Sequence, residues 1–293
     1  MVYYCADDYG ISEASNRRIE KCLREGIINK VSVLPNGILD NFQERLVGKE
    51  ICLSLHINLV EGAPLTDPRE LDLLVNDQGY FRYSFAGLFL MSFSGKRKRL
   101  QAQIHKEIQT QVRFWKNVMG KDVPLCLDSH QHTHLIPLIF RTLLQVIEEE
   151  NVTVFSLRVP AEPLMPYLLT PSLYPAYLQS GLVKHCILKV LKFVNYGALK
   201  KSKLTHPCFV GAMFSGRLTQ DKINKLLPHY QRIAKRRGQA VEFAMHPGYM
   251  EPGEKTIPGI REDFKKFYLS PWRKREFHTL LDFHAKEKAE RRS

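Results

Sequence analysis

The sequence lacks any hydrophobic run that approaches the ~20 residues needed to cross a bilayer as a helix. Its start, from Met1 to Asp8, has neither the basic residues nor the apolar segment of a signal peptide. We therefore expect no membrane partner and a cytoplasmic location.

Cysteine is scarce as well, and none of the six cysteines forms a C-x-x-C pair. They are spread along the chain at Cys5, Cys22, Cys52, Cys126, Cys186 and Cys208. Several lie within apolar runs, where a free cysteine packs like a small hydrophobic residue. The pattern excludes a disulfide framework and indicates a reducing compartment.

Acidic residues are fewer than basic ones, 30 against 43, which gives a net charge of +13. Such a charge suits an acidic partner (nucleic acid, a membrane surface or an anionic substrate), but it also suits a solvated basic surface. No nucleic-acid-binding signature accompanies the basic residues. They fall in short runs at 96–99, 200–201, 235–237, 265–266, 273–275 and 291–292. We therefore expect solvated faces and no nucleic-acid partner.

The rest of the composition is that of an ordinary globular protein: of 293 residues, 44% are hydrophobic and 25% are charged. Apolar, strand-like runs alternate with helical patterns along most of the chain, which predicts a parallel α/β sheet or barrel. The runs are 2–6, 30–34, 51–57, 123–127, 152–159, 208–213 and 241–245. The main helical patterns are 15–25, 99–119, 138–149 and 219–237. We predict a single domain over 1–293, built as a distorted (β/α) barrel of about seven strands.

Two segments fit this scheme poorly. Residues 160–207 are rich in proline and then show an apolar helical pattern around 187–194. We interpret them as an insertion over the barrel mouth, either a lid or a dimer surface. Residues 274–293 are strongly basic and predict a last charged helix that frays.

The most informative segment is 128–134, where an aspartate and three histidines stand at every second position. They are Asp128, His130, His132 and His134. In an extended segment these positions share one face. Packing alone rarely needs such a set, because each buried ring brings two nitrogens that need partners. A fully extended segment separates Asp128 and His134 by about 20 Å, so one metal contacts one or two of the histidines.

Further polar groups end other predicted strands: Asp7 and Asp8 the first, His56 the third and His246 the last. Each also has a plain structural interpretation. The aspartates suit a solvated turn or a helix cap, His56 a hydrogen-bonded core position, and His246 a His-Pro-Gly turn. Their coincidence at one end of separate parallel strands, where barrels carry catalytic groups, predicts an active site.

In these motifs the chain resembles the YdjC-like carbohydrate deacetylases, a family that includes chitooligosaccharide deacetylases. The resemblance covers nearly the whole chain and is weak in residues 160–207 and in the basic tail. The motifs are Ala6-Asp7-Asp8-Tyr9-Gly10, Val31-Ser32-Val33-Leu34-Pro35-Asn36-Gly37, Leu55-His56-Ile57-Asn58-Leu59-Val60-Glu61-Gly62, Asp128-Ser129-His130-Gln131-His132-Thr133-His134, Phe209-Val210-Gly211 and Met245-His246-Pro247-Gly248-Tyr249. The chain departs from the family at Cys5, where the family usually has asparagine, and at Pro35, where it often has an aliphatic residue.

The resemblance implies a fold related to NodB-type polysaccharide deacetylases, a divalent metal and a homodimer. It implies that Asp8, His56 and His130 hold the metal and that Asp7 is the catalytic base. The metal implied by the family is Mg²⁺. An aspartate with two histidines is instead a donor set that suits Zn²⁺, Mn²⁺ or iron, because magnesium prefers oxygen ligands.

These observations predict a metal-dependent hydrolase that removes an N-acetyl group from an amino sugar in a short oligosaccharide. Asp7 would take a proton from a water whose pKa the metal lowers. His246 would donate a proton to the leaving amine, and Asp128 would hold a histidine in one tautomer. The candidates for substrate contact or ligand support are His132, His134 and Arg158. Two alternatives stay open: a metal-dependent phosphoesterase on the same barrel, and a non-enzymatic basic binding protein.

Overall fold

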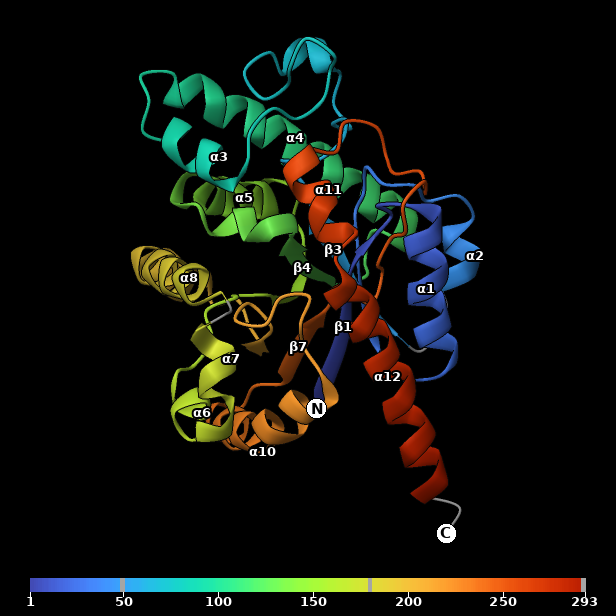
Figure 1. The fold of residues 1–293 in the computed structure, drawn as a ribbon. Helices are drawn as coiled ribbons and strands as arrows, with labels where there is room; N and C mark the ends of the chain where they lie inside the picture. The colour runs from blue at the N-terminus through green and yellow to red at the C-terminus, as the bar shows by residue number, and fades with distance from the viewer. Residues whose placement is uncertain (48–50, 179–180, 291–293) are drawn as a thin grey trace.

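A computed structural model describes residues 1–47, 51–178 and 181–290 of the chain. Its centre is one sheet of seven parallel strands in the order β5-β4-β3-β2-β1-β7-β6, which curls into a half-barrel (Figure 1). The strands are β1 (Val2–Tyr9), β2 (Lys30–Val33), β3 (Cys52–Ile57), β4 (Leu125–Ser129), β5 (Val154–Leu157), β6 (Cys208–Val210) and β7 (Val241–Met245). All seven predicted strands are present, and the predicted fold class is confirmed.

Helices cover the outside of this sheet (Figure 1). The α-helices are α1 (Glu13–Arg24), α2 (Phe42–Leu46), α3 (Phe85–Met91), α4 (Arg97–Met119), α5 (Pro137–Glu149), α6 (Met165–Leu168), α7 (Tyr174–Leu178), α8 (Leu182–Val194), α9 (Tyr196–Ser202), α10 (Gln220–Arg237), α11 (Glu262–Tyr268) and α12 (Pro271–Glu290). The short 3-10 helices are η1 (Pro68–Glu70), η2 (His130–Leu135) and η3 (Pro171–Leu173). The four main helical patterns correspond to α1, α4, α5 and α10. Among the described residues, no helix combines the length and the apolar character that a bilayer span needs.

Alternate residues of the strands face two different environments. On β3, Leu53, Leu55 and Ile57 join the hydrophobic core between sheet and helices. Ser54 and His56 face the inside of the half-barrel, where both contact Asp128 of the neighbouring β4. The parity that predicts an inward His56 is confirmed. The concave side of the sheet is therefore polar, and the convex side is the core.

The segment between β5 and β6 contains α6, η3, α7, α8 and α9. Helix α8 packs against η2, beside the carboxyl end of β4. This places part of the segment interpreted as an insertion next to the polar interior of the half-barrel.

The last charged helix predicted for the tail is present as α12, which begins at Pro271. Its first turns are buried, although the basic run at 273–275 was expected to be solvated. Arg273 and Glu276 contact Asp8 and His246, while Phe277 and Leu280 join the hydrophobic core.

Candidate active site

The first strand presents two successive carboxylates to one cavity. Neighbouring residues of a regular strand point to opposite faces, but Asp8 has a left-handed φ of 69°, and the pairing of β1 with β2 shifts register between Ala6 and Tyr9. This irregularity lets Asp7 and Asp8 both line the same buried space, although they are adjacent in sequence.

The histidine segment does not continue β4, so the single face expected for an extended segment over 128–134 is absent. The strand ends at Ser129, and η2 follows with left-handed φ values of 53° at Gln131 and 60° at His132. The chain turns so tightly that the three histidines do not share one face: His130 and His132 line one cavity, while His134 contacts Ser129 and the Arg158 carbonyl. A single shared face would have required β4 to continue for five more residues, to His134.

Only His130 of the three joins a group of possible metal ligands. Its Nδ1 lies 2.9 Å from Asp8 Oδ1, and His56 Nε2 lies 3.5 Å from the same oxygen. The three donor atoms all lie within 4.8 Å of one another and are buried. A carboxylate and two imidazoles from separate strands form a donor set that divalent metals commonly use.

The other nitrogen of His56 is fixed by Asp128. His56 Nδ1 donates to Asp128 Oδ1 over 2.6 Å, while Ser32 and Ser54 donate to the other carboxylate oxygen. This arrangement turns His56 Nε2 toward Asp8, as carboxylate partners do for metal-binding histidines. Burial alone would lower the pKa of His56, but the charge of Asp128 raises it to about 10. The site therefore favours positive charge at this position.

His132 and His134 lie apart from that donor set. His134 contacts Ser129 Oγ through Nδ1 and the Arg158 carbonyl through Nε2, at 2.5 and 2.8 Å. Burial lowers its pKa to about 4. His132 lines the same small cavity as Asp7 and packs edge-on against Phe209. Its Nδ1 is buried without a hydrogen-bond partner.

Arg158 is fully buried beneath the cavity and links three acids. Its guanidinium donates to both oxygens of Asp7, at 2.7 and 2.9 Å, and to Glu242 at 2.5 Å. It also lies 3.1 Å from Asp128. Burial alone would raise the pKa of Asp7, but the guanidinium lowers it. Asp7 is thus held as a carboxylate although it is shielded from water.

A second group of possible ligands, formed by Cys5, Asp128 and Glu242, already contains a cation. The Arg158 guanidinium lies 3.1 Å from Cys5 Sγ and contacts both acids. Lys30 adds a further ion pair to Glu242 at 2.7 Å. These charges balance within the protein, so this group is a structural network beneath the site.

Arg273 of α12 holds the second oxygen of Asp8. Its guanidinium donates to Asp8 Oδ2 and lies against the rings of Phe267 and Tyr268, at 4.3 and 4.4 Å. The carboxylate of Asp8 therefore presents Oδ1 to the histidines and Oδ2 to the arginine. Its pKa is held well below the usual range by His130 and Arg273, against the effect of burial.

His246 follows β7 and also lines the cavity. Its ring Nδ1 is buried without a partner, and burial lowers its pKa to about 3. The turn that carries it is fixed on α1, where Ser15 Oγ donates to the carbonyl of Gly248 at 2.9 Å. A Cβ at Gly248 would come within 2.1 Å of that hydroxyl, so a larger residue there would displace the Ser15 side chain and break this hydrogen bond.

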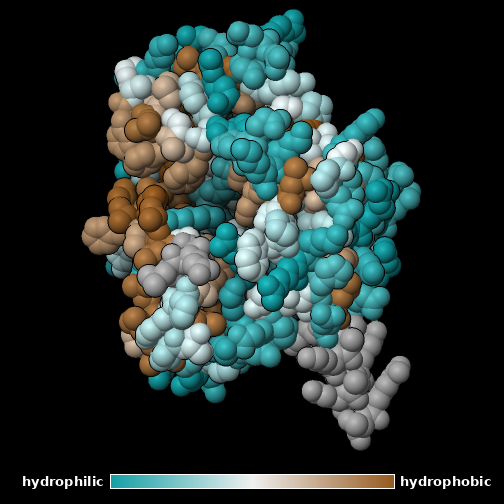
Figure 2. Space-filling model, viewed as in Figure 1, coloured by the Kyte–Doolittle hydropathy of each residue, from teal (hydrophilic) through white to brown (hydrophobic). Residues whose placement is uncertain are grey.

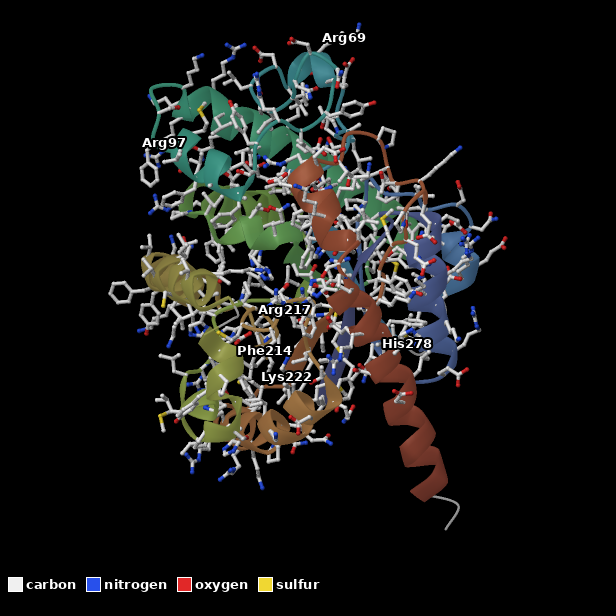
Figure 3. The ribbon with its side chains drawn as sticks, viewed as in Figure 1. Arg69, Arg97, Phe214, Arg217, Lys222 and His278 are labelled. Atoms are coloured by element: carbon white, nitrogen blue, oxygen red, sulfur yellow. The ribbon has the colours of Figure 1, made fainter. Side chains whose placement is uncertain are left out.

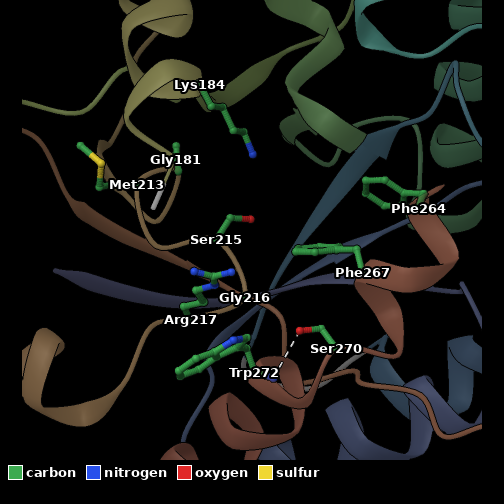
Figure 4. A pocket seen from close by; sticks show the side chains of 11 residues that line it. Gly181, Lys184, Met213, Ser215, Gly216, Arg217, Phe264, Phe267, Ser270 and Trp272 are labelled. Carbon is green, nitrogen blue, oxygen red and sulfur yellow. Dashed lines mark hydrogen bonds between the residues drawn. The ribbon is translucent and has the colours of Figure 1, made fainter. Parts of the chain in front are cut away.

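Lys184 lines two cavities, a small buried one and a larger outer one. The inner space has about 20 Å³, room for about one water or an ion. Lys184 of α8 lines both this space and an outer pocket of about 300 Å³. Figure 4 shows Lys184 pointing into the outer pocket opposite Phe267 and Trp272. Arg217 stacks on Trp272 there, 5.3 Å from the ring centre, and Figure 3 shows its place beside Phe214 and Lys222.

Sequence reasoning does not single out Lys184 and Arg273. Lys184 is one of several lysines on an amphipathic helix, and Arg273 belongs to a basic run interpreted as solvated. The buried Lys30 and Glu242 did carry a signal, since each is a charged residue inside an apolar strand. Lys30 and Glu242 point to the same side of the sheet as His56, and charged residues on that side indicate a polar interior of the barrel.

The comparisons with known proteins agree with this architecture. A family model described as "YdjC-like protein" matches residues 2–291. A protein named carbohydrate deacetylase from Danio rerio is 31% identical over 158 residues, 54% of this chain and 49% of its own length. One of the same name from Thermoanaerobacter pseudethanolicus is 24% identical over 212 residues, 70% of this chain and 80% of its own length. The chain thus spans about half the length of the vertebrate relative.

Among solved structures, one from Enterococcus faecalis titled a putative cellobiose-phosphate cleavage protein has a TM-score of 0.61. The match covers 99% of this chain and 94% of the other at 15% identity. At this identity the likeness concerns the fold, and it supports the half-barrel described above.

Proposed function

The chain belongs to the YdjC-like family, and from that premise we propose that it is a metal-dependent carbohydrate deacetylase that hydrolyses the N-acetyl group of an amino sugar. One observation carries the proposal. The possible ligands Asp8, His56 and His130 converge on one point, and the ionised Asp7 lines the same cavity. The names of the curated relatives supply the substrate class.

Asp8, His56 and His130 would hold the divalent metal. Such an ion supplies Lewis-acid chemistry: it polarises an amide carbonyl and lowers the pKa of a bound water. The nitrogen-rich donor set favours Zn²⁺, Mn²⁺ or iron over the Mg²⁺ implied by the family.

Asp7 would accept the proton that the attacking water loses. Arg158 holds both of its oxygens and keeps it ionised. A carboxylate has about four lone-pair sites, so the side of Asp7 that faces the cavity remains able to accept a proton. Glu242 and Asp128 hold the same guanidinium in place, which supports a role of Arg158 in orienting Asp7.

His246 and Lys184 would serve the leaving amine and the carbonyl oxygen. A pKa of about 3 makes His246 neutral at rest, so it protonates the amine only after it receives a proton within the cavity. Lys184 reaches the same space with three N–H donors and a positive charge. It is placed to stabilise the negative oxygen of a tetrahedral intermediate.

The outer pocket would hold the sugar. Its volume of about 300 Å³ is at the lower end for small-molecule sites. The aromatic side chains of Phe267 and Trp272 line it beside polar groups, a composition that suits a sugar ring with apolar faces and polar edges.

The test is acetate release from a panel of N-acetylated chitooligosaccharides. Metal-stripped protein is reloaded separately with zinc, manganese, iron or magnesium. We expect metal-dependent acetate release that Asp7→Asn lowers by at least about 100-fold. The matched control is Asp40→Asn, which alters an exposed aspartate and should retain full activity.

Folded, metal-loaded protein that releases no acetate from any of these sugars would contradict the proposal. Phosphate release from a phosphosugar without acetate release would instead favour the phosphoesterase. Neither activity, together with nucleic-acid affinity that survives Asp7→Asn, would favour a binding protein.

A further inference from the structure

Helix α8 carries two apolar stripes, and one of them faces solvent. His185, Leu188 and Leu191 point inward and are buried. Val183, Val190 and Phe193 point outward, with exposed fractions of 75%, 61% and 81%. A helix that is apolar on both sides is normally covered on both sides. The outward apolar stripe of α8 is therefore exposed to solvent in the isolated chain and is suited to contact with a partner.

The exposed stripe extends onto neighbouring elements. Leu90 on α3 and Phe93 just after it are each 69% exposed, and Met165 and Leu168 of α6 are 55% and 58% exposed. Helices α3, α8 and α6 lie along one side of the molecule, on the left in Figure 1. Figure 2 shows hydrophobic side chains gathered along that side. We name this surface the α8 face, defined by Leu90, Phe93, Met165, Leu168, Val183, Ile187, Val190 and Phe193.

The segments that build the α8 face contain no acidic residue. The sequence has no aspartate or glutamate in 78–106, which includes α3, or in 163–220, which includes α6 and α8. The basic residues of these two segments are Arg82, Lys96, Arg97, Lys98, Arg99, Lys106, Lys184, Lys189, Lys192, Lys200, Lys201, Lys203 and Arg217. Arg99 and Lys106 pair with Asp72 and Glu70 from outside these segments. The remaining basic residues give the two segments an excess of positive charge.

Several of these basic residues border the apolar side chains directly. Lys96, Arg97 and Lys98 are exposed and follow Phe93 in sequence. Figure 3 shows Arg97 at the edge of the molecule, beside the turn between α3 and α4. Lys200 and Lys201 are exposed on α9, directly after α8. The surface therefore combines protruding apolar side chains with cations at its border.

We propose that the α8 face binds the surface of an anionic lipid membrane. Apolar and aromatic side chains insert at the boundary between headgroups and acyl chains, while nearby lysines and arginines attract acidic headgroups. The expectation of no membrane partner rests on the missing transmembrane run. That argument excludes a span and leaves binding at the membrane surface open.

The same observations disfavour two other partners. A symmetric contact with a second copy would bring two positively charged, acid-free faces together, and like charges across an interface oppose association. A nucleic acid would match the charge but would leave large side chains such as Phe193 and Leu90 without an apolar partner. An anionic lipid surface offers acidic headgroups to the basic residues and an apolar region to the exposed hydrophobic side chains.

Membrane binding would also place the active-site mouth beside the bilayer. Helix α8 presents Val183 outward, while the next residue, Lys184, lines the pocket. The proposal does not depend on the reaction catalysed at that site, so binding is tested separately from acetate release.

The experiment is co-sedimentation of the full chain with vesicles of phosphatidylcholine alone and of phosphatidylcholine with phosphatidylserine, at low and high salt. We expect binding only to the vesicles that contain phosphatidylserine, weakened by salt. The double variant Val190→Ser/Phe193→Ser should bind at least about tenfold more weakly. Both side chains are exposed, so its thermal unfolding and its activity on a free oligosaccharide should match those of the wild type.

The matched control is Val123→Ser/Phe155→Ser. These two residues are 42% and 55% exposed and are not part of the α8 face; they belong to the amino ends of β4 and β5. The control should bind like the wild type. Absence of binding to anionic vesicles, or equal loss of binding in both double variants, would overturn the proposal. So would a stable dimer that dissociates on Val190→Ser/Phe193→Ser, since a second copy would then cover the face.

Discussion

At the scale of single residues, Lys184 lines both the small buried cavity and the outer pocket. It belongs to a helix outside the half-barrel, yet its ammonium group reaches the cavity lined by Asp7, Asp8 and His246. Burial lowers the pKa of Lys184, and the negative charges of Glu162, Asp7 and Asp8 oppose this shift. A cation held between the acids and the outer pocket would interact most strongly with a substrate oxygen that becomes negative.

We therefore expect Lys184→Met to lower kcat for acetate release by about 100-fold, the usual effect of removing one donor to an oxyanion. Lys184 is outside the donor set of Asp8, His56 and His130, so the bound metal should be unchanged when measured by elemental analysis. Lys189→Met, on the same helix, is the control and should retain activity. Equal rates for Lys184→Met and the wild type would show that the lysine does not contact the reacting group.

The sequence motifs and the family resemblance together predicted part of the site. Asp8, His56 and His130 come together as the resemblance implies, and Asp128 contacts a histidine as the sequence suggests. The positions of His132 and His134 could not be predicted, because a left-handed turn after Ser129 is set by packing around η2 and not by the alternating pattern. Arg273 could not be found either, because the sequence of a basic run does not reveal whether its residues are solvated or paired with a buried acid.

At the scale of elements, the η2 turn buries His134 in its neutral form. The pKa of His134 is about 4 in the folded protein, against about 6.5 in an unfolded chain. Between these pH values the unfolded chain binds a proton that the folded protein does not. The stabilising effect of neutral His134 is therefore complete above pH 6.5 and is lost as the pH falls toward 4.

His134→Gln should reduce this pH dependence. Urea unfolding at about pH 7 and about pH 5 should show a change in stability that is about 2 kcal/mol smaller in the variant than in the wild type. Glutamine keeps an N–H for the Arg158 carbonyl, which limits other losses. His278→Gln, at an exposed position of α12 that Figure 3 labels, should behave like the wild type. An identical pH dependence in all three proteins would mean that His134 is not held neutral by the fold.

Elements were more predictable than their termini and contacts. The seven strands follow from apolar runs, and α4 from the spacing of Leu100, Ile104, Ile108, Val112 and Trp115, all of which are buried. The first turns of α12 were misjudged, because its charged residues Arg273 and Glu276 are buried by the polar site and not by an apolar face. Patterns based on hydrophobicity miss helices that pack through charges.

At the scale of the whole molecule, the site connects distant parts of the chain. Asp8 lies on β1, His56 on β3 and His130 after β4, while Arg273 of the last helix holds Asp8. In the sheet, β1 lies between β2, which follows it closely in sequence, and β7, which comes from the C-terminal part of the chain. Residues that are far apart in sequence therefore meet at β1. A metal bound by these residues binds the folded chain and not the unfolded one, because the unfolded chain does not bring the three donors together.

Removal of the metal should therefore lower the stability of the entire fold. A metal present at about 100 times its Kd stabilises the folded state by about 2.7 kcal/mol, which corresponds to a rise in Tm of roughly 5–10 °C for a domain of this size. We expect chelation to lower Tm by that amount, and reloading with zinc or manganese to restore it. Asp8→Asn should abolish the metal-dependent shift, whereas Asp40→Asn should preserve it. If neither the chelator nor added metal changed the Tm, Asp8, His56 and His130 would not form a metal site. Asp7 would then lack the metal ion that its proposed role as a base requires.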